Sequence, residues 1–240
     1  MKWLLIVVSC AVAACAARTI PPPLKSSGNA WLLFIDDMHL DFRNTGRLRD
    51  LLKMVGNQVI KDGDAFMVRS SGPSQVAIEW TMDRSRLQSE LRKATGNALR
   101  PSDIVDGGRR DPLFEVRYRA GIAMAFASEL VSAARFVHAR SISLIYVSNG
   151  YDLEDPAFRV RLLRLAELAR AAHVRIFPIN PQMVFAGHDL DLEVDAERCQ
   201  KHLATTQQSL RLLADKTGGL ATSEAQDAAA AVKKIAEFRR

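Results

Sequence analysis

Apolar runs alternate with amphipathic stretches along this chain, and the alternation predicts alternating strands and helices. Residues 31–35 are apolar at every position, and residues 141–148 and 174–179 are mainly apolar, as expected for strands buried on both faces of a parallel sheet. Between and beyond these runs, apolar residues recur every three or four positions, which is typical of helices that bury one side. The helical patterns cover about residues 45–60, 113–138, 156–172, 192–216 and 226–238.

Shorter segments complete the predicted sheet. Residues 64–70 and 75–80 flank a Ser-Gly-Pro-Ser turn and are interpreted as antiparallel strands, and Leu220–Thr222 is interpreted as a short strand. Asp83 is the expected N-cap of a helix over residues 84–94. Because parallel neighbours need crossover helices, the pattern predicts an α/β fold: a doubly wound, mostly parallel six-stranded sheet with one antiparallel edge strand and helices on both faces, formed by residues 30–240.

The first residues have the layout of a secretory signal. A cation at Lys2 precedes an apolar region too short to span a bilayer comfortably, and small residues follow. The sequence Val-Ala-Ala-Cys that ends at Cys15 resembles the lipobox of bacterial lipoproteins, which implies a signal over residues 1–17, cleavage before Cys15 and acylation of that cysteine. The alternative is ordinary cleavage after Ala16, which would leave a soluble secreted protein. Residues 18–29, rich in Pro, Ser and Gly, are interpreted as a tether, and the predicted location is periplasmic or anchored to the outer membrane.

Composition and charge narrow the classes of function. Hydrophobic residues make up 48% of the chain and charged residues 25%, which is ordinary for a globular protein. The formal net charge is +6, but 33 cations are scattered among 27 acidic residues, and no nucleic-acid recognition motif accompanies them. The chain also lacks the glycine-rich motifs of dinucleotide and P-loop sites and the GxSxG motif of α/β-hydrolases. We therefore expect no nucleic-acid partner.

Polar side chains follow two of the predicted parallel strands at the point where each strand ends. Asp36, Asp37 and His39 come after residues 31–35, and Asn149 and Asp152 come after residues 141–148. In an open α/β sheet, ligands bind beyond the carboxyl ends of the strands, so these two loops should meet on one edge. Two interpretations of the carboxylates remain open: they are oxygen ligands for Mg²⁺ or Ca²⁺, or Asp36 caps loop amides while Asp37 faces water.

The order of these segments resembles a von Willebrand factor type A (vWA) domain, most closely the divergent version in acidobacterial secreted proteins. The resemblance covers nearly the whole mature chain and is carried by FIDDMHL (34–40), IEWTMDRSRL (78–87), SLIYVSNGYD (143–152), HVRIFPIN (173–180) and LLADKTGGLATS (212–223). The family binds a metal ion through an Asp-x-Ser-x-Ser motif after the first strand. Here Asp36 matches the Asp, but Met38 and Leu40 replace the serines and Asn149 replaces a later Asp. The resemblance therefore implies a degenerate metal site, with Asp36 and Asn149 as the remaining ligands.

The resemblance implies a secreted or lipid-anchored, non-catalytic domain that binds a protein partner in the bacterial cell envelope. The expected contact residues lie in the loops after the first and fourth strands: Asp36, Asp37, His39, Asn149 and Asp152. The loop from Arg100 to Pro112 is expected to form a variable rim around them. We expect no cofactor, or else Mg²⁺ or Ca²⁺ bound at the degenerate metal site.

Two alternatives are kept beside the binding domain. One is a phosphatase of haloacid-dehalogenase type, in which Asp36 would attack phosphorus and Ser148 would hold the phosphoryl group, although Met38 stands where that family has its general acid. The other is a purely structural envelope subunit that uses a different face, such as the basic helix around Arg161 and Arg164.

Overall fold

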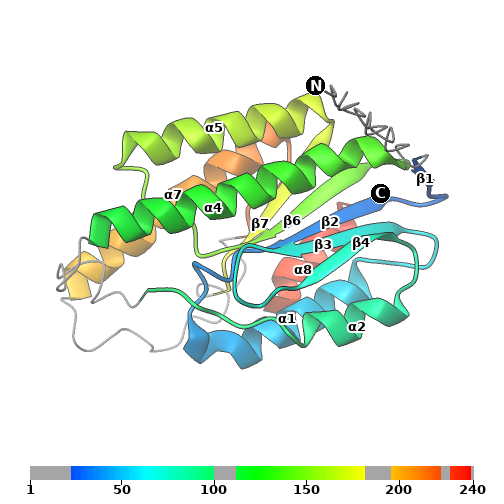
Figure 1. Ribbon diagram of the computed structural model, residues 1–240, viewed down its shortest axis with the longest axis horizontal. Helices are drawn as coiled ribbons and strands as arrows, with labels where there is room; N and C mark the ends of the chain where they lie inside the picture. Colours follow the sequence, from blue (N-terminus) through cyan, green and yellow to red (C-terminus); the bar gives the residue numbers. More distant parts are fainter. Residues whose placement is uncertain (1–22, 100–111, 182–195, 223–227, 239–240) are drawn as a thin grey trace, which may run out of the picture.

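The computed structural model describes residues 23–99, 112–181, 196–222 and 228–238 (Figure 1). Three predictions lie outside these residues: the signal sequence, the acylation of Cys15, and nearly all of the loop from Arg100 to Pro112. No helix in the described part of the chain combines the length and the apolar character needed to cross a membrane.

A five-stranded sheet forms the centre of the molecule. Its strands are β4 (Ala77–Thr81), β3 (Ala65–Ser70), β2 (Ala30–Ile35), β6 (Ile142–Val147) and β7 (Val174–Ile179), in that spatial order. β2 pairs in parallel with β3 and β6, β6 pairs in parallel with β7, and β4 is antiparallel to β3. The mostly parallel sheet with one antiparallel edge strand is therefore confirmed. Its register aligns the carboxyl ends of β2, β3 and β6 on one edge.

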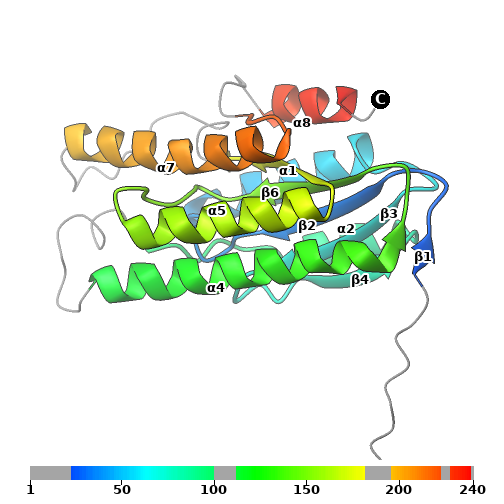
Figure 2. The ribbon, with the colours of Figure 1, turned by 90° about the horizontal axis from the view of Figure 1, so that it is seen from above.

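Helices cover both faces of the sheet (Figures 1 and 2). α1 (Thr45–Gln58), α2 (Ser85–Leu91) and α8 (Ala228–Glu237) pack on one face, and α4 (Pro112–Ser132), α5 (Pro156–Ala171) and α7 (Ala196–Thr217) pack on the other. Alternate residues of β2 point to opposite faces, so Leu33 and Ile35 join one core while Leu32 and Phe34 join the other. This is why β2 is apolar at every position.

The predicted sixth strand is not a strand. Residues 220–222 run beside β7, and both the backbone N–H and the hydroxyl of Thr222 donate to the carbonyl of Pro178, at 3.3 and 2.9 Å. Pro178 has no N–H group and cannot donate a hydrogen bond to another strand, which is typical of an edge position. The sheet in the described part of the chain therefore has five strands.

The packed structure begins before Ala30. β1 (Leu24–Lys25) pairs in parallel with β5 (Val137–His138), which follows α4 through the short 3₁₀ helix η2 (Ala133–Phe136). The hydroxyl of Ser26 donates to the carbonyl of Gly63 at 2.7 Å, and the N–H of Asn29 donates to the buried carboxylate of Asp64 at 2.9 Å. Residues 24–29 are therefore part of the fold rather than of the predicted tether. A strand of two residues is too short to show the alternation of apolar and polar positions from which a strand is predicted.

Candidate functional site

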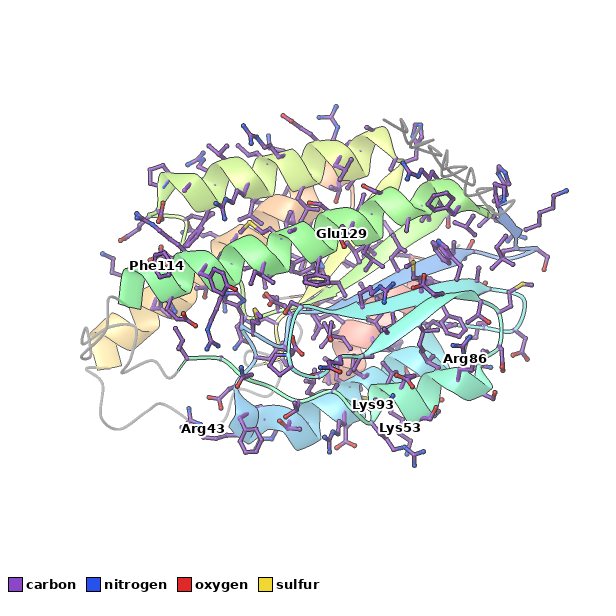
Figure 3. All side chains as sticks on the ribbon, in the orientation of Figure 1. Arg43, Lys53, Arg86, Lys93, Phe114 and Glu129 are labelled. Carbon is purple, nitrogen blue, oxygen red and sulfur yellow. The ribbon has the colours of Figure 1, made fainter. Side chains whose placement is uncertain are left out.

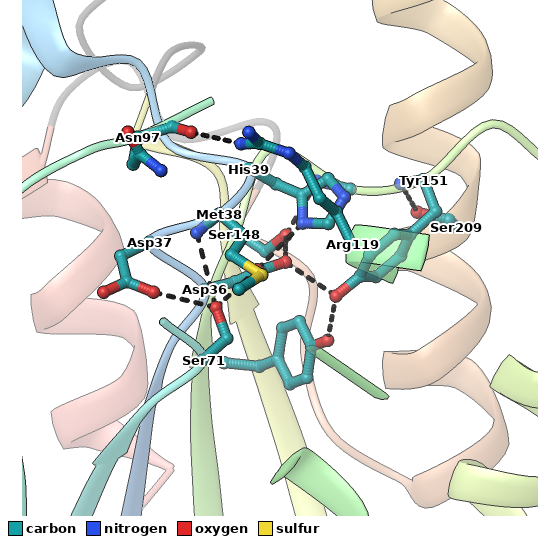
Figure 4. A network of polar contacts seen from close by, with 12 residues as sticks. Asp36, Asp37, Met38, His39, Ser71, Asn97, Arg119, Ser148, Tyr151 and Ser209 are labelled. Carbon is teal, nitrogen blue, oxygen red and sulfur yellow. Dashed lines mark hydrogen bonds and ion pairs between the residues drawn. The ribbon is translucent and has the colours of Figure 1, made fainter. Parts of the chain in front are cut away.

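Three loops meet at the carboxyl edge of the sheet (Figure 4). They begin at Asp36 after β2, at Ser71 after β3 and at Ser148 after β6. Backbone hydrogen bonds continue the sheet into each loop. The N–H of Asp36 donates to the carbonyl of Val147 at 2.9 Å, that of Ser71 to the carbonyl of Ile35 at 3.0 Å, and that of Ser148 to the carbonyl of Ile179 at 3.1 Å. The sheet thus holds the first residue of each loop in a fixed position.

Asp36 is the centre of this site. Its side chain is fully buried, and protein donors surround both carboxylate oxygens. Oδ1 lies 2.9 Å from Nδ1 of His39 and 3.1 Å from the hydroxyl of Ser71. Oδ2 accepts from the hydroxyl of Ser148 at 2.7 Å and from that of Tyr151 at 2.6 Å. A buried carboxylate is costly unless it is paired and hydrogen-bonded, and these four side chains meet that need.

A second tyrosine extends the network. The hydroxyls of Tyr146 and Tyr151 are hydrogen-bonded. Each hydroxyl has one proton, and that of Tyr151 points to Asp36, so Tyr146 is the donor to Tyr151. Burial, together with the charge on Asp36, raises the pKa of both tyrosines well above the usual value. Both hydroxyls therefore stay protonated and both serve as donors.

The balance of interactions keeps Asp36 ionised. Burial by itself raises the pKa of the carboxyl group, but attraction to His39 and hydrogen bonds from His39, Tyr151 and Ser148 lower it by more. The net pKa lies below the ordinary value for aspartate. The group is thus a hydrogen-bonded carboxylate at neutral pH.

Asp37 points the other way and is also fully buried. Its carboxylate accepts from the hydroxyl of Ser71 at 2.9 Å and from the N–H of Ser74 at 2.8 Å, and its carbonyl accepts from the N–H of Asn97 at 2.7 Å. The single hydroxyl proton of Ser71 therefore lies between two carboxylates. The two adjacent aspartates share the Ser71 hydroxyl, and each also has donors of its own: His39, Ser148 and Tyr151 for Asp36, and the N–H of Ser74 for Asp37.

These positions correct the predicted roles. Asp36 and Asp37 cannot contact a partner in this conformation, and Asp37 does not face water but receives the loop amide of Ser74. His39, Asn149 and Asp152 are partly exposed. Asp152 accepts from the N–H of Glu154 within its own loop at 2.9 Å, and none of the hydrogen bonds within the described residues joins it to the Asp36 network. The side-chain oxygen of Asn149 is buried and has no partner in the described part of the chain.

The residues around Asp36 do not fit a divalent cation. A metal ion needs oxygen lone pairs directed toward it, whereas the imidazole and hydroxyl groups here direct protons at the carboxylate. Leu40, at one of the two serine positions of the family motif, is buried in the core beside α1. Met38, at the other, lies so close to Gly72 that a Cβ at residue 72 would be 2.9 Å from its side chain. Among the residues that the structure describes, no group of three His, Cys, Asp or Glu side chains could hold a metal.

The geometry gives no support to a phosphatase. The nucleophile of such an enzyme must reach phosphorus, but Asp36 is fully buried and both its oxygens are occupied by protein donors. The hydroxyl of Ser148 points to Asp36 rather than to a site for a phosphoryl group. Met38 can donate no proton to a leaving group.

The first turns of α4 connect the loops and carry exposed aromatic side chains that the sequence analysis does not single out. Arg119 donates to the carbonyl of Asn97 at 2.6 Å, and Arg117 donates to Asp155 of the loop after β6 at 2.6 Å. Phe114 and Tyr118 are 67% and 56% exposed and stack on each other with ring centroids 6.4 Å apart.

Another exposed aromatic side chain follows the loop after β2. Phe42 opens the 3₁₀ helix η1 (Phe42–Asn44) and is 69% exposed. Its neighbour Arg43 and the α4 residue Phe114 lie at the same end of the molecule (Figure 3). Aromatic side chains from two separate elements are therefore presented at the carboxyl edge of the sheet.

No protein-family model matches the sequence, and no curated protein matches it either. Solved structures similar to this chain include manganese-loaded Plasmodium vivax TRAP protein, with 12% identity, a TM-score of 0.40, and coverage of 64% of this chain and 57% of that chain. The N-terminal domain of TFIIH p34 has 14% identity and a TM-score of 0.41, with coverage of 88% of this chain and 97% of that chain. Identities this low leave the function to be inferred from the residues of the site itself.

Proposed function

We propose that this chain is a non-catalytic, vWA-like protein-binding domain of the bacterial cell envelope, and that its partner meets the loops after β2 and β6. The surface in question, here called the strand-end rim, consists of His39, Phe42, Phe114, Tyr118 and Asn149. The observation that carries the proposal is the exposure of three aromatic side chains at the same end of the molecule as the loops that a buried hydrogen-bond network holds in place. Aromatic residues are enriched among the side chains that dominate protein interfaces.

The buried network favours binding because it fixes the rim in advance. Asp36 links the three loops through Ser71, Ser148 and Tyr151, and Arg119 links α4 to the loop at Asn97. A surface that is already ordered loses less conformational entropy when a partner docks, so more of the contact energy appears as affinity. In this proposal the two aspartates organise the rim, and the aromatic residues contact the partner.

Replacing Phe42 and Tyr118 by serine should weaken partner binding by at least about 10-fold, since such aromatic anchors contribute more than about 1 kcal/mol each. The measurement is cross-linking of the purified protein in an envelope extract, identification of the captured protein, and titration of that protein against each variant. The matched control is Phe126→Ser, which removes a partly exposed phenylalanine of α4 that lies farther along the helix. Unchanged affinity in the double variant, with unchanged melting temperature, would place the binding surface elsewhere.

Anchoring to the envelope is a separate prediction. Cys15→Ser should move the protein from the membrane fraction to the soluble fraction, because acylation needs the thiol. An anchor with two acyl chains is enough to hold a protein stably on a membrane, and the variant would lack it. Cell fractionation followed by immunoblotting measures this, with Cys10→Ser as the control that leaves Cys15 intact. An unaltered distribution would favour cleavage after Ala16 and a soluble secreted protein.

A further inference from the structure

A pocket of about 650 Å³ lies at the edge of the sheet opposite the strand-end rim. It is formed where β6 and β7 begin, and its walls are residues 137–142, the end of α5, residues 172–175 and Thr217. Its volume falls within the range of about 300–1,000 Å³ that is usual for small-molecule sites. None of its residues takes part in the network around Asp36.

The lining of this pocket is strongly basic. It contains three arginines and two histidines and no acidic residue: His138, Arg140, Arg170, His173 and Arg175. Among the described residues, none of the three arginines forms an ion pair. Arg175 is partly buried, and its guanidinium lies 5.9 Å from the ring centroid of Phe238. Outside the pocket, Arg43, Arg84 and Arg117 each pair with an aspartate, whereas exposed arginines such as Arg92 and Arg159 form no ion pair with the described residues.

Helix termini explain only part of this charge. Arg170 lies in the last turn of α5, where a cation stabilises the negative end of the helix dipole. Arg140 lies in the loop before β6, and Arg175 lies within β7, so neither has this reason to be there. Positive charges carried by residues that line one pocket repel one another unless an anion lies among them.

We propose that this basic pocket binds a phosphate group, and that its source is the headgroup of an anionic membrane phospholipid. Guanidinium is planar and presents paired donors that match phosphate oxygens, which makes arginine the residue of choice for such groups. The histidines add ring N–H groups that can donate to phosphate oxygens. The pocket is large enough for a phosphate with its glycerol substituent.

The chain enters the fold beside this pocket. β1 pairs with β5, so the chain enters the fold at Leu24 beside Val137 and His138, which line the pocket. From Cys15 to Leu24 is nine residues, which can span at most about 30 Å. Assignment of the lipid as the source rests on the proposed envelope location, whereas phosphate binding by the pocket does not.

Vesicle binding and a soluble probe test the proposal together. The secreted chain carrying Cys15→Ser is used, so that no acyl chain contributes to binding. It is sedimented with vesicles of phosphatidylglycerol and phosphatidylcholine, and with vesicles of phosphatidylcholine alone, and it is titrated calorimetrically with glycerol 3-phosphate. We expect at least about 10-fold stronger binding to the anionic vesicles, as several lysine or arginine contacts each contribute near such a surface.

Matched charge-removal variants decide whether the pocket is responsible. Arg140→Gln with Arg170→Gln should reduce vesicle binding about 10-fold, while Arg92→Gln with Arg159→Gln, which removes the same charge from exposed positions outside the pocket, should change it less than about 3-fold. Equal losses in the two double variants would overturn the proposal, because the attraction would then be general. Binding of neither probe would also overturn it.

The two probes separate the sources of phosphate and leave the rim proposal independent. Pocket-dependent binding of glycerol 3-phosphate without vesicle binding would support phosphate recognition and overturn the lipid as its source. Vesicle binding that needs Arg140 and Arg170 supports both parts. None of these results depends on the partner at the strand-end rim, so failure here and failure there are distinguishable.

Discussion

Replacing Asp36 by alanine is expected to lower the free energy of unfolding by about 3–5 kcal/mol, the range for breaking a buried charged pair by removing one partner. The variant leaves His39, Ser71, Ser148 and Tyr151 without the acceptor that they share in a fully buried site. Water can replace a carboxylate only if it finds room and partners there. Urea unfolding at pH 7 measures the loss.

Asp152→Ala is the matched control. Asp152 lies in the loop after β6 at a partly exposed position, and its one hydrogen bond among the described residues is from the N–H of Glu154. Loss of such a local bond should cost about 1 kcal/mol or less. If Asp36→Ala were no more destabilising than this control, the network around Asp36 would not be the element that holds the loops.

The same carboxylate should give the protein an acid-sensitive component of stability. The pKa of Asp36 is lower in the folded state than the value of about 3.9 expected in the unfolded chain. Its contribution is therefore fully present above about pH 4 and is lost as the pH falls through the lower folded-state pKa. Urea unfolding from pH 7 to pH 2 should show a steeper decline below pH 4 in the wild type than in Asp36→Asn. Parallel curves would mean that Asp36 is not ionised in the fold.

Gly150→Ala should destabilise the protein by about 2–6 kcal/mol, combining backbone strain of about 1–3 kcal/mol with overpacking of a similar size. Gly150 has a φ of +87°, a conformation that residues with a side chain rarely adopt. A Cβ there would also lie 2.2 Å from the carbonyl oxygen of Thr206 in α7. The loop after β6 can approach α7 this closely only because residue 150 has no side chain.

Thermal and urea unfolding measure the stability of Gly150→Ala, and Gly46→Ala is the matched control. Gly46 lies in the first turn of α1, and a Cβ there meets nothing within 4 Å. That substitution should be neutral or stabilising by up to about 1 kcal/mol, because alanine favours the helix. A Gly150→Ala protein as stable as Gly46→Ala would show that the loop can move away from α7 without cost.

The sheet was predictable because its strands carry a strong local signal. The central strand is apolar at every position, and parallel strands with crossover helices leave few alternative arrangements. The predicted long helix from residue 113 instead ends at Ser132, and a 3₁₀ turn and β5 occupy its last residues. Short elements such as β1 and β5 depend on each other across more than a hundred residues, so neither is visible locally.

The location of the site was predictable from the sequence, but its chemistry was not. The ends of β2 and β6 do bring Asp36 and Ser148 together, as the strand order requires. What the sequence could not reveal is that Tyr151 would direct its proton at Asp36 and that Ser71 would lie between Asp36 and Asp37, because that depends on side-chain orientation across three loops. One signal was present: Met38 and Leu40 remove the hydroxyls that a metal site would need, so the carboxylate had to find other partners.

The pairing of β1 with β5 has a mechanical consequence. The chain enters the fold at one end of the sheet, and the strand-end rim lies at the other, with β2 running between them. Tension between an N-terminal anchor and a protein held at the rim would therefore act along β2. The hydrogen bonds from β2 to β3 and to β6 lie across that direction and would be loaded in shear together rather than opened one after another. Such an arrangement suits a domain that must stay folded while it is pulled.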